Sequence, residues 1–213
     1  MGMLFGRFLS KSTQQIMIYS TGFIVLVIGL GMAMKTTDIL SMLVCLVGGS
    51  IIGDICSIEQ KLETLGVILH KKVKSNNALF VEGFITASLT FCVGSMAIIG
   101  AIEEGINDNP SIFYIKAVLD GVCAFIFAAT FGLGVVFSAF CVLFYQGALS
   151  LLSGAIEGAL SQDMIEGLSS TGGVLILALG FNILNVTKVP VGNMLPSLVL
   201  IIGYIYIKNA FFM

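Results

Sequence analysis

The stretch from Gly121 to Ile156, GVCAFIFAATFGLGVVFSAFCVLFYQGALSLLSGAI, decides the fold of this chain. Its 36 residues carry no charge. A single α-helix of this length would extend over about 54 Å, whereas the hydrocarbon core of a bilayer is only about 30 Å thick. The stretch is therefore too long for a single membrane crossing. We expect it to cross twice and to turn at Gly132-Leu133-Gly134.

The remaining sequence extends this pattern to the whole chain. Of its 213 residues, 57% are hydrophobic and 10% are charged, against roughly 25% charged residues in soluble domains. The charges are clustered and leave uncharged intervals of about 20 residues, the length of a membrane-spanning helix. We predict an all-α fold, a polytopic transmembrane helical bundle in which residues 1–213 form a single integral membrane domain. About seven spans are expected, near residues 16–34, 38–56, 78–100, 112–131, 135–157, 171–187 and 190–209.

Residues 57–74 predict a helix of another kind. Apolar residues recur there at helical spacing, while Lys and Glu occupy the other positions, which is typical of an amphipathic helix lying on a membrane surface. Ser57 and Gln60 have the spacing of a capping box at its start. His70 lies among the solvated residues of this helix, so we expect it not to be a ligand.

The positions of the basic residues predict the orientation. Lys and Arg in short loops mark the cytoplasmic side of a membrane protein. Most of those in this chain fall on one side of the seven-span layout, namely Arg7, Lys11, Lys61, Lys71, Lys72, Lys74 and Lys188. We therefore expect the N-terminus and the 57–74 helix in the cytoplasm and the C-terminus outside.

Two segments show weak internal similarity. Residues 22–45 and 173–196 align at a constant offset, so that Gly29 meets Gly180. A third copy would begin at Gly83. Transporters often contain such repeats, although apolar sequences also align by chance, and both interpretations stay open.

Several glycine-rich motifs occur along the chain. They are GGSIIGD at 48–54, EGF at 82–84, CVGSMAIIG at 92–100, DG at 120–121, YQG at 145–147, TGG at 171–173 and GNMLP at 192–196. In these motifs and their order, the chain resembles the YqgA/YdfK-type bacterial inner-membrane proteins over nearly its whole length. The resemblance implies a multi-pass protein of the bacterial cytoplasmic (inner) membrane, of a family for which a transport role has been suggested and no substrate is established. Residues 1–6 look like the tail of a further apolar segment with which family members begin. Either a span is missing from this protein or its true start lies upstream. A missing span would place the N-terminus outside the cell.

Polar residues inside the expected spans are the candidate functional residues. A charged side chain at the centre of a membrane helix costs about 2.5–3.5 kcal/mol on insertion scales, so those present are functional candidates by default. We expect Asp120 to be the central ionisable group of a solute pathway, with hydrogen bonds supplied by the three amides Gln146, Asn182 and Asn193. The full candidate set is Asp120, Gln146, Asn182, Asn193, Cys92, Ser95, Lys116 and Glu82.

Each candidate also has a structural interpretation. Asp120 would pair with Lys116, one helical turn earlier. Gln146 and Asn182 would join helices by hydrogen bonds, and Glu82 would extend to the membrane interface. Pro196 cannot donate a hydrogen bond to the carbonyl of Gly192, so Asn193 would lie beside a free acceptor, in a broken helix or at a plain kink.

The resulting functional hypothesis is a transporter or channel for a small solute or ion, surrounded by lipid and forming a homo-oligomer. The alternative is a non-transporting scaffold that signals through the 57–74 helix. No nucleotide-binding loop, metal motif or nucleophile elbow is present, so we expect neither an enzyme nor a cofactor or metal site. The five cysteines lie in apolar segments without a CxxC pair and are interpreted as small core residues. No basic patch indicates a nucleic-acid partner.

Overall fold

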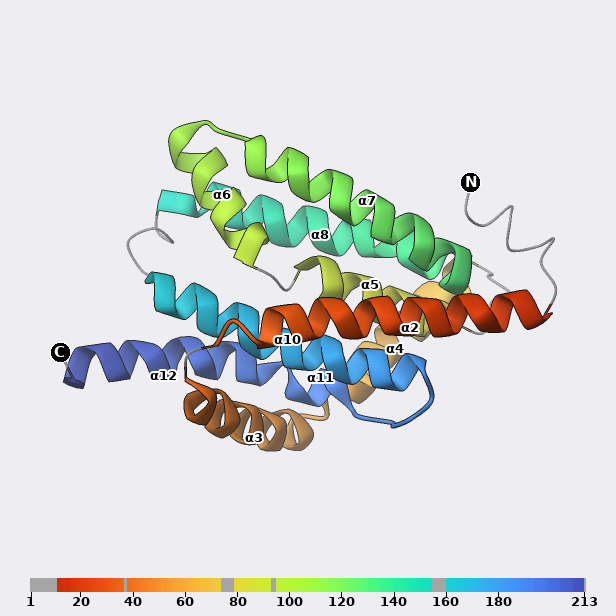
Figure 1. Ribbon diagram of the computed structural model, residues 1–213, viewed down its shortest axis with the longest axis horizontal. Helices are drawn as coiled ribbons and strands as arrows, with labels where there is room; N and C mark the ends of the chain where they lie inside the picture. The colour runs from red at the N-terminus through yellow and green to blue at the C-terminus, as the bar shows by residue number, and fades with distance from the viewer. Residues whose placement is uncertain (1–10, 37, 74–78, 93–94, 155–159, 213) are drawn as a thin grey trace.

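The structure is a computed structural model that describes residues 11–36, 38–73, 79–92, 95–154 and 160–212. Within these ranges it is a bundle of helices without strands (Figure 1). The helices are α2 (Lys11–Ala33), α3 (Ile39–Ile55), α4 (Ile58–Val73), α5 (Phe80–Cys92), α6 (Ser95–Asn107), α7 (Ser111–Phe131), α8 (Gly134–Leu151), α10 (Gln162–Ile183), α11 (Val191–Met194) and α12 (Pro196–Phe212). Residues 1–6, with the predicted remnant of an extra segment, lie outside the described residues.

The helices have the length and composition of membrane spans. Five candidate spans lie within the described residues, and seven are reached if each of two bent helix pairs counts as one. Large apolar side chains such as Val27, Val118 and Phe144 are exposed on the outside of the bundle, where lipid would cover them. Helix α10 is the central element, because 61% of its most apolar 18-residue stretch is buried, against 22% or less of the corresponding stretch of the other four candidate spans. The predicted polytopic helical bundle is confirmed.

The turn between α7 and α8 lies where the sequence predicts it. Helix α7 ends at Phe131, and Gly132 has a φ of 72°, in the left-handed region that favours glycine. A side chain at Gly134 would clash with the carbonyl of Phe80. The absence of a side chain at Gly134 thus lets the start of α8 lie against the start of α5.

Two predicted spans are wrong in their boundaries. The span expected at 78–100 consists of two helices, α5 and α6, whose axes differ by 63°. The span expected at 171–187 begins earlier, at Gln162, because the Ser161 hydroxyl accepts a hydrogen bond from the N–H of Met164 and caps the helix. Asp163 in its first turn is favoured by the helix dipole, so an acidic residue there does not mark a loop.

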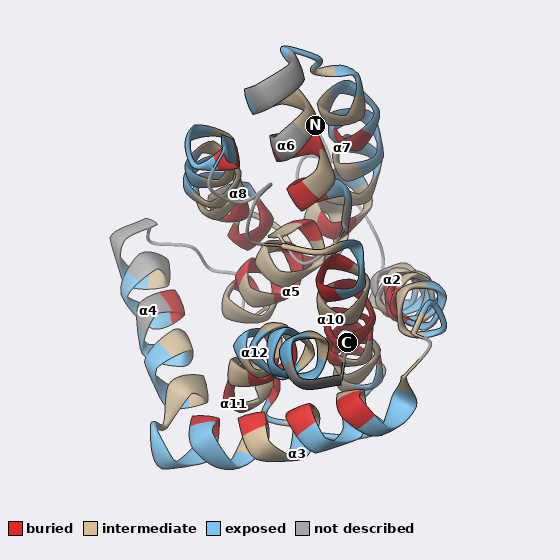
Figure 2. Ribbon diagram, turned by 90° about the vertical axis from the view of Figure 1, so that its left-hand side faces the viewer, coloured by how far each residue is buried: buried red, intermediate tan, exposed pale blue. Residues whose placement is uncertain are grey.

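Helices α3 and α4 run obliquely to the other long helices. Figure 2 shows most of the bundle end on but α3 and α4 from the side. The predicted 57–74 helix is present as α4, but it packs more closely on the bundle than a surface strut would. Its Gly66 lies against Val81 of α5, and the ring of His70, interpreted as solvated, lies 5.2 Å from that of Phe80. Cys56, at the turn between α3 and α4, is exposed and is not the core residue expected.

Helices α2 and α10 pack antiparallel along their glycines. A Cβ on Gly29 would lie 2.6 Å from the backbone nitrogen of Leu177, and one on Gly180 would lie 2.7 Å from the Leu26 side chain. The alignment of residues 22–45 with 173–196 relates the two contacts, because Gly29 aligns with Gly180 and Leu26 aligns with Leu177. These contacts are those expected of an inverted repeat. Gly83, where a third copy would begin, instead faces Phe131 of α7.

Candidate functional site

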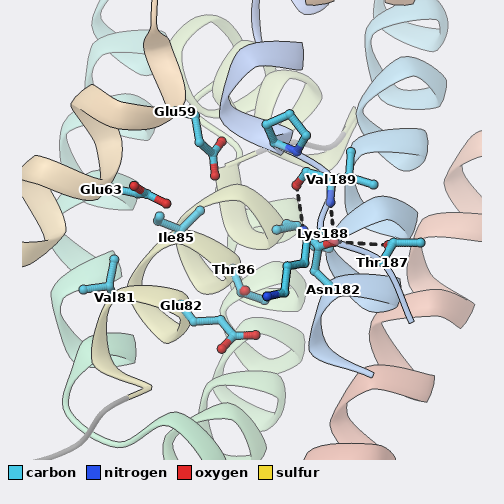
Figure 3. A pocket seen from close by; sticks show the side chains of 12 residues that line it. Glu59, Glu63, Val81, Glu82, Ile85, Thr86, Asn182, Thr187, Lys188 and Val189 are labelled. Carbon is cyan, nitrogen blue, oxygen red and sulfur yellow. Dashed lines mark hydrogen bonds between the residues drawn. The ribbon is translucent and has the colours of Figure 1, made fainter. Parts of the chain in front are cut away.

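A cavity of about 480 Å³ lies between α4, α5, the end of α10 and the loop from α10 to α11 (Figure 3). Small-molecule sites in proteins usually have volumes of about 300–1,000 Å³. The lining residues are Glu59, Glu63, Val81, Glu82, Ile85, Thr86, Leu179, Asn182, Thr187, Lys188, Val189 and Pro190. The cavity therefore has the size and the mixed polar and apolar lining of a solute site.

Charged groups surround the cavity. Glu59 and Glu63 come from α4 and Glu82 from α5, while Lys188 is carried by the loop. In Figure 3 the Lys188 side chain extends toward Glu82 and Thr86. Neutral side chains of α5 and α10 complete the wall, so the carboxylates face a partly apolar space.

Thr86 provides an unused hydrogen-bonding group at this cavity. It is fully buried, and its hydroxyl has no hydrogen-bond partner among the described residues. A buried hydroxyl without a partner is destabilising by about 1–3 kcal/mol, so such groups usually have a bound water or ligand.

Asn182 positions the loop that carries Lys188. Its Nδ2 donates to the carbonyl of Val189 at 2.8 Å, and its Oδ1 accepts from the N–H of Val189 at 2.8 Å and from the hydroxyl of Thr187 at 3.2 Å. The amide thus holds the residues on both sides of Lys188. Its hydrogen bonds join α10 to its own following loop rather than to another helix.

Helices α4 and α11 are joined by two reciprocal hydrogen bonds. The Oδ1 of Asn193 accepts from the N–H of Glu59 at 2.8 Å, in the first turn of α4. The carboxylate of Glu59 accepts from the N–H of Gly192 in α11. The predicted capping box at Ser57 is wrong, because Ser57 has a φ of 52° instead of extended backbone. The first turn of α4 is instead capped by the side chain of Asn193 in α11.

The motifs at 48–54 and 192–196 meet at this point. The Nδ2 of Asn193 donates to Asp54 at 3.2 Å. A side chain on Gly53 would clash with the carbonyl of Asn193, so α3 can approach α11 this closely only with glycine there. The carbonyl of Gly192 is not the free acceptor expected, since it accepts from the N–H of Leu195 at 3.2 Å in a tighter turn.

Other candidate residues lie away from the cavity, around α7 and α8. Lys116 and Asp120 form an ion pair one helical turn apart, with Lys116 buried. Cys92, at the end of α5, is within electrostatic range of both. Gln146 is half-buried on α8. Ser95 begins α6, and its side chain lies outside the described residues.

The candidate residues therefore form two groups and not the single pathway expected around Asp120. Glu82, Asn182 and Asn193 lie at or beside the cavity, while Lys116, Asp120 and Cys92 gather near α7. Asp120 pairs with Lys116, as the structural interpretation of the sequence predicts. Because the two charges neutralise each other, Asp120 presents no unpaired charge to a solute.

Four residues at the cavity were missed by sequence reasoning. Glu59 and Glu63 were interpreted as part of a solvated face, although their spacing of four places both on one side of a helix. Lys188 could have been identified from the sequence, because it is the one charged residue between Glu166 and Lys208. Nothing in the sequence singles out Thr86 from the other hydroxyls of α5.

A second, smaller cavity of about 130 Å³ lies at the opposite end of α10. Asp163 and Glu166 from the first turns of α10 line it, together with Asp38 and Lys208. The Nζ of Lys208 donates to Asp38 at 2.6 Å. Within the described ranges, no three His, Cys, Asp or Glu side chains are grouped closely enough to hold a metal ion at either cavity.

These features define the class of the protein as a polytopic helical membrane protein with a solute-sized, charged cavity beside its central helix. The chain belongs to the family described as protein of unknown function (DUF554), whose model matches residues 1–206. It is 30% identical over 214 residues to the uncharacterized membrane protein YdfK of Bacillus subtilis (strain 168), covering 99% of this chain and 91% of the relative. It is also 30% identical over 178 residues to the uncharacterized protein YqgA of Escherichia coli (strain K12), covering 81% and 76% respectively. No solved structure matches the chain.

Proposed function

We propose that the protein carries a small solute or ion across the bacterial cytoplasmic membrane, as a multi-pass protein, and that the cavity between α4, α5 and α10 is its solute site. The observation that carries this proposal is the charged lining of the cavity. Ionisable side chains within a membrane bundle are costly and usually mark a solute or ion path. Here Glu82 of α5, inside a candidate bent span, faces a space of solute size, and the charged residues of α4 and the loop line the same space.

The positions of the two cavities support alternating access. One lies beside Asn182 in the last turn of α10, and the other beside Asp163 in its first turn. The 22 residues of α10 extend over about 33 Å, close to the thickness of the hydrocarbon core. The antiparallel pairing of α2 with α10 supports the same mechanism, since inverted repeats allow such carriers to open to either side. The distribution of basic residues assigns the larger cavity to the cytoplasmic side.

The scaffold alternative makes the 57–74 helix, α4, the working surface and the buried polar residues structural contacts between helices. In this structure Glu59 and Glu63 of α4 instead line the cavity, and the reciprocal capping ties α4 to α11, which follows the loop that carries Lys188. These contacts favour a role of α4 as a movable wall of a solute site.

Uptake into proteoliposomes tests the proposal. The full chain would be reconstituted and offered a panel of labelled amino acids, organic acids, alkylamines and inorganic cations. We expect uptake of at least one class above that of empty liposomes, and a reduction of at least about tenfold in Glu82→Gln, because a charge-assisted contact contributes about 1.5–3 kcal/mol. Glu104→Gln on α6 is the matched control and should leave uptake unchanged. Uptake of none of the panel, or uptake indifferent to Glu82→Gln, would contradict the proposal.

A further inference from the structure

Resting on the proposed function, we further propose that the cavity between α4, α5 and α10 selects organic cations: solutes with a protonated amine and a small apolar body. Its carboxylates would bind the ammonium group, and the hydroxyl of Thr86 would accept one of its N–H groups. The apolar part of the solute would lie against α5 and α10. Three separate observations lead to this class of solute.

The first observation is the balance of charge. Three carboxylates line the cavity and one ammonium group, that of Lys188, opposes them. Within the described residues neither Glu63, Glu82 nor Lys188 takes part in an ion pair. A cleft with an excess of one sign of charge and low-dielectric walls concentrates ions of the other sign, so the cavity attracts cations.

The second observation is the Thr86 hydroxyl. Threonine in a helix commonly donates to the carbonyl four residues earlier, as Thr64 does to Gln60 at 2.7 Å. Thr86 is completely buried at the cavity wall and makes no hydrogen bond among the described residues. Its oxygen is an acceptor that a solute N–H would satisfy.

The third observation is the apolar part of the lining. Val81 and Ile85 of α5 and Leu179 of α10 are among the residues that line the cavity of about 480 Å³. A bare inorganic ion would leave these apolar side chains and most of the volume unused, whereas an alkyl group would bury apolar surface against them. The lining therefore favours an organic ammonium ion.

Lys188 would then act as the competing cation of the empty site. It is exposed on a loop held by Asn182, and its side chain extends toward Glu82 and Thr86 in Figure 3. An incoming ammonium group would have to displace it. Removing this charge should therefore strengthen the binding of a cationic solute and weaken that of an anionic one.

The experiment is isothermal titration of the purified full chain in detergent with n-butylammonium, using butyrate and 1-butanol as anionic and neutral probes of similar shape. We expect n-butylammonium alone to bind, about tenfold more weakly to Glu82→Gln and more tightly to Lys188→Met. Thr86→Val should weaken binding severalfold while leaving the melting temperature of the ligand-free protein unchanged or higher, since an orphan hydroxyl is removed. Thr171→Val on α10 is the matched control, because Thr171 is equally buried and unbonded but does not line the cavity; it should leave binding unchanged.

Other results overturn the proposal. Binding of butyrate or butanol as tight as that of n-butylammonium, no binding of n-butylammonium at millimolar concentrations, or binding indifferent to both Glu82→Gln and Thr86→Val would exclude a cation site here. Uptake of an anionic or neutral solute into proteoliposomes would leave the transport proposal intact and reject cation selectivity. Binding of n-butylammonium in the cavity without uptake of any solute would support a cation site and reject the transport proposal.

Discussion

Glu59 and Asn193 cap each other's helices: the side-chain oxygen of Asn193 accepts from the backbone of Glu59, and the carboxylate of Glu59 accepts from the N–H of Gly192, next to Asn193. The two residues are far apart in sequence, and each satisfies a donor that a helix start leaves without an internal partner. Glu59 also lines the larger cavity. A movement of the loop before α11 would consequently be transmitted to α4.

Replacing Asn193 by Ala should loosen α4. The change removes the cap on Glu59 and the hydrogen bond to Asp54, and loss of a cap costs about 0.5–2 kcal/mol. We expect a lower melting temperature in detergent and faster hydrogen exchange in the first turns of α4. Gln60→Ala, at an exposed position of the same helix, should change neither; equal effects of the two substitutions would argue against the capping interaction.

Replacing Gly29 by Ala should separate α2 from α10. The new Cβ would lie 2.6 Å from the backbone of Leu177, and overpacking of this kind costs about 1–3 kcal/mol. Gly31 of the same helix has nothing within 4 Å of an added Cβ, so Gly31→Ala should be neutral or stabilising by about 0.5–1 kcal/mol through its greater helix preference. Melting temperatures that rank the two variants in the opposite order would show that the helices do not pack as described.

Replacing Asp120 alone by Asn should destabilise the protein more than replacing both Asp120 and Lys116 by apolar residues. It leaves the buried Lys116 without its half-buried partner; breaking a fully buried pair costs about 3–5 kcal/mol, so we expect a loss below that range. Lys116→Met combined with Asp120→Leu should recover most of the melting temperature. If the pair is only structural, this double variant also keeps solute uptake. Full loss of uptake in the stable double variant would return Asp120 to the solute pathway.

The ion pair of Asp38 with Lys208 should make stability depend on acidic pH. The hydrogen bond from Lys208, followed by those from the side chain and backbone of Ser41, holds the pKa of Asp38 well below its usual value. Its stabilising contribution is therefore complete above the pKa of an unfolded aspartate, about 3.9, and is lost as the pH falls toward the lower folded-state pKa. We expect Asp38→Asn to lower the melting temperature at pH 7 and to have a smaller effect near pH 3. An effect that is the same at both pH values would show that the carboxylate is not stabilised in the folded state.

The helices could be predicted from sequence because lipid requires long uncharged stretches. The turn at Gly132 follows from the length of the stretch around it, and α4 follows from its amphipathic period. The bend between α5 and α6 could not be predicted, since its flanking residues are as apolar as those of a straight span. The early start of α10 was missed because Asp163 indicates a loop unless the cap by Ser161 is considered.

The candidate site was predicted in part. Glu82, Asn182 and Asn193 were identified by their polarity, but polarity does not tell which helix faces which. Asp120 seemed central because it is charged, whereas its charge is matched by Lys116 within the same helix. Glu59 and Lys188 reach the cavity from segments expected outside the membrane core, and only tertiary packing brings them to it.

Alternating access requires the cavity beside α10 to open to water at both membrane surfaces in turn. Its most direct test is labelling of Ile85→Cys, which lines the cavity, in a variant without native cysteines, by a membrane-impermeant trimethylammonium thiol reagent. The reagent would be added to right-side-out and to inside-out vesicles. We predict that the cysteine is labelled in both vesicle orientations, and that a bound solute protects it from the reagent in both orientations. Labelling from one side alone, or from neither, would contradict alternating access through this cavity.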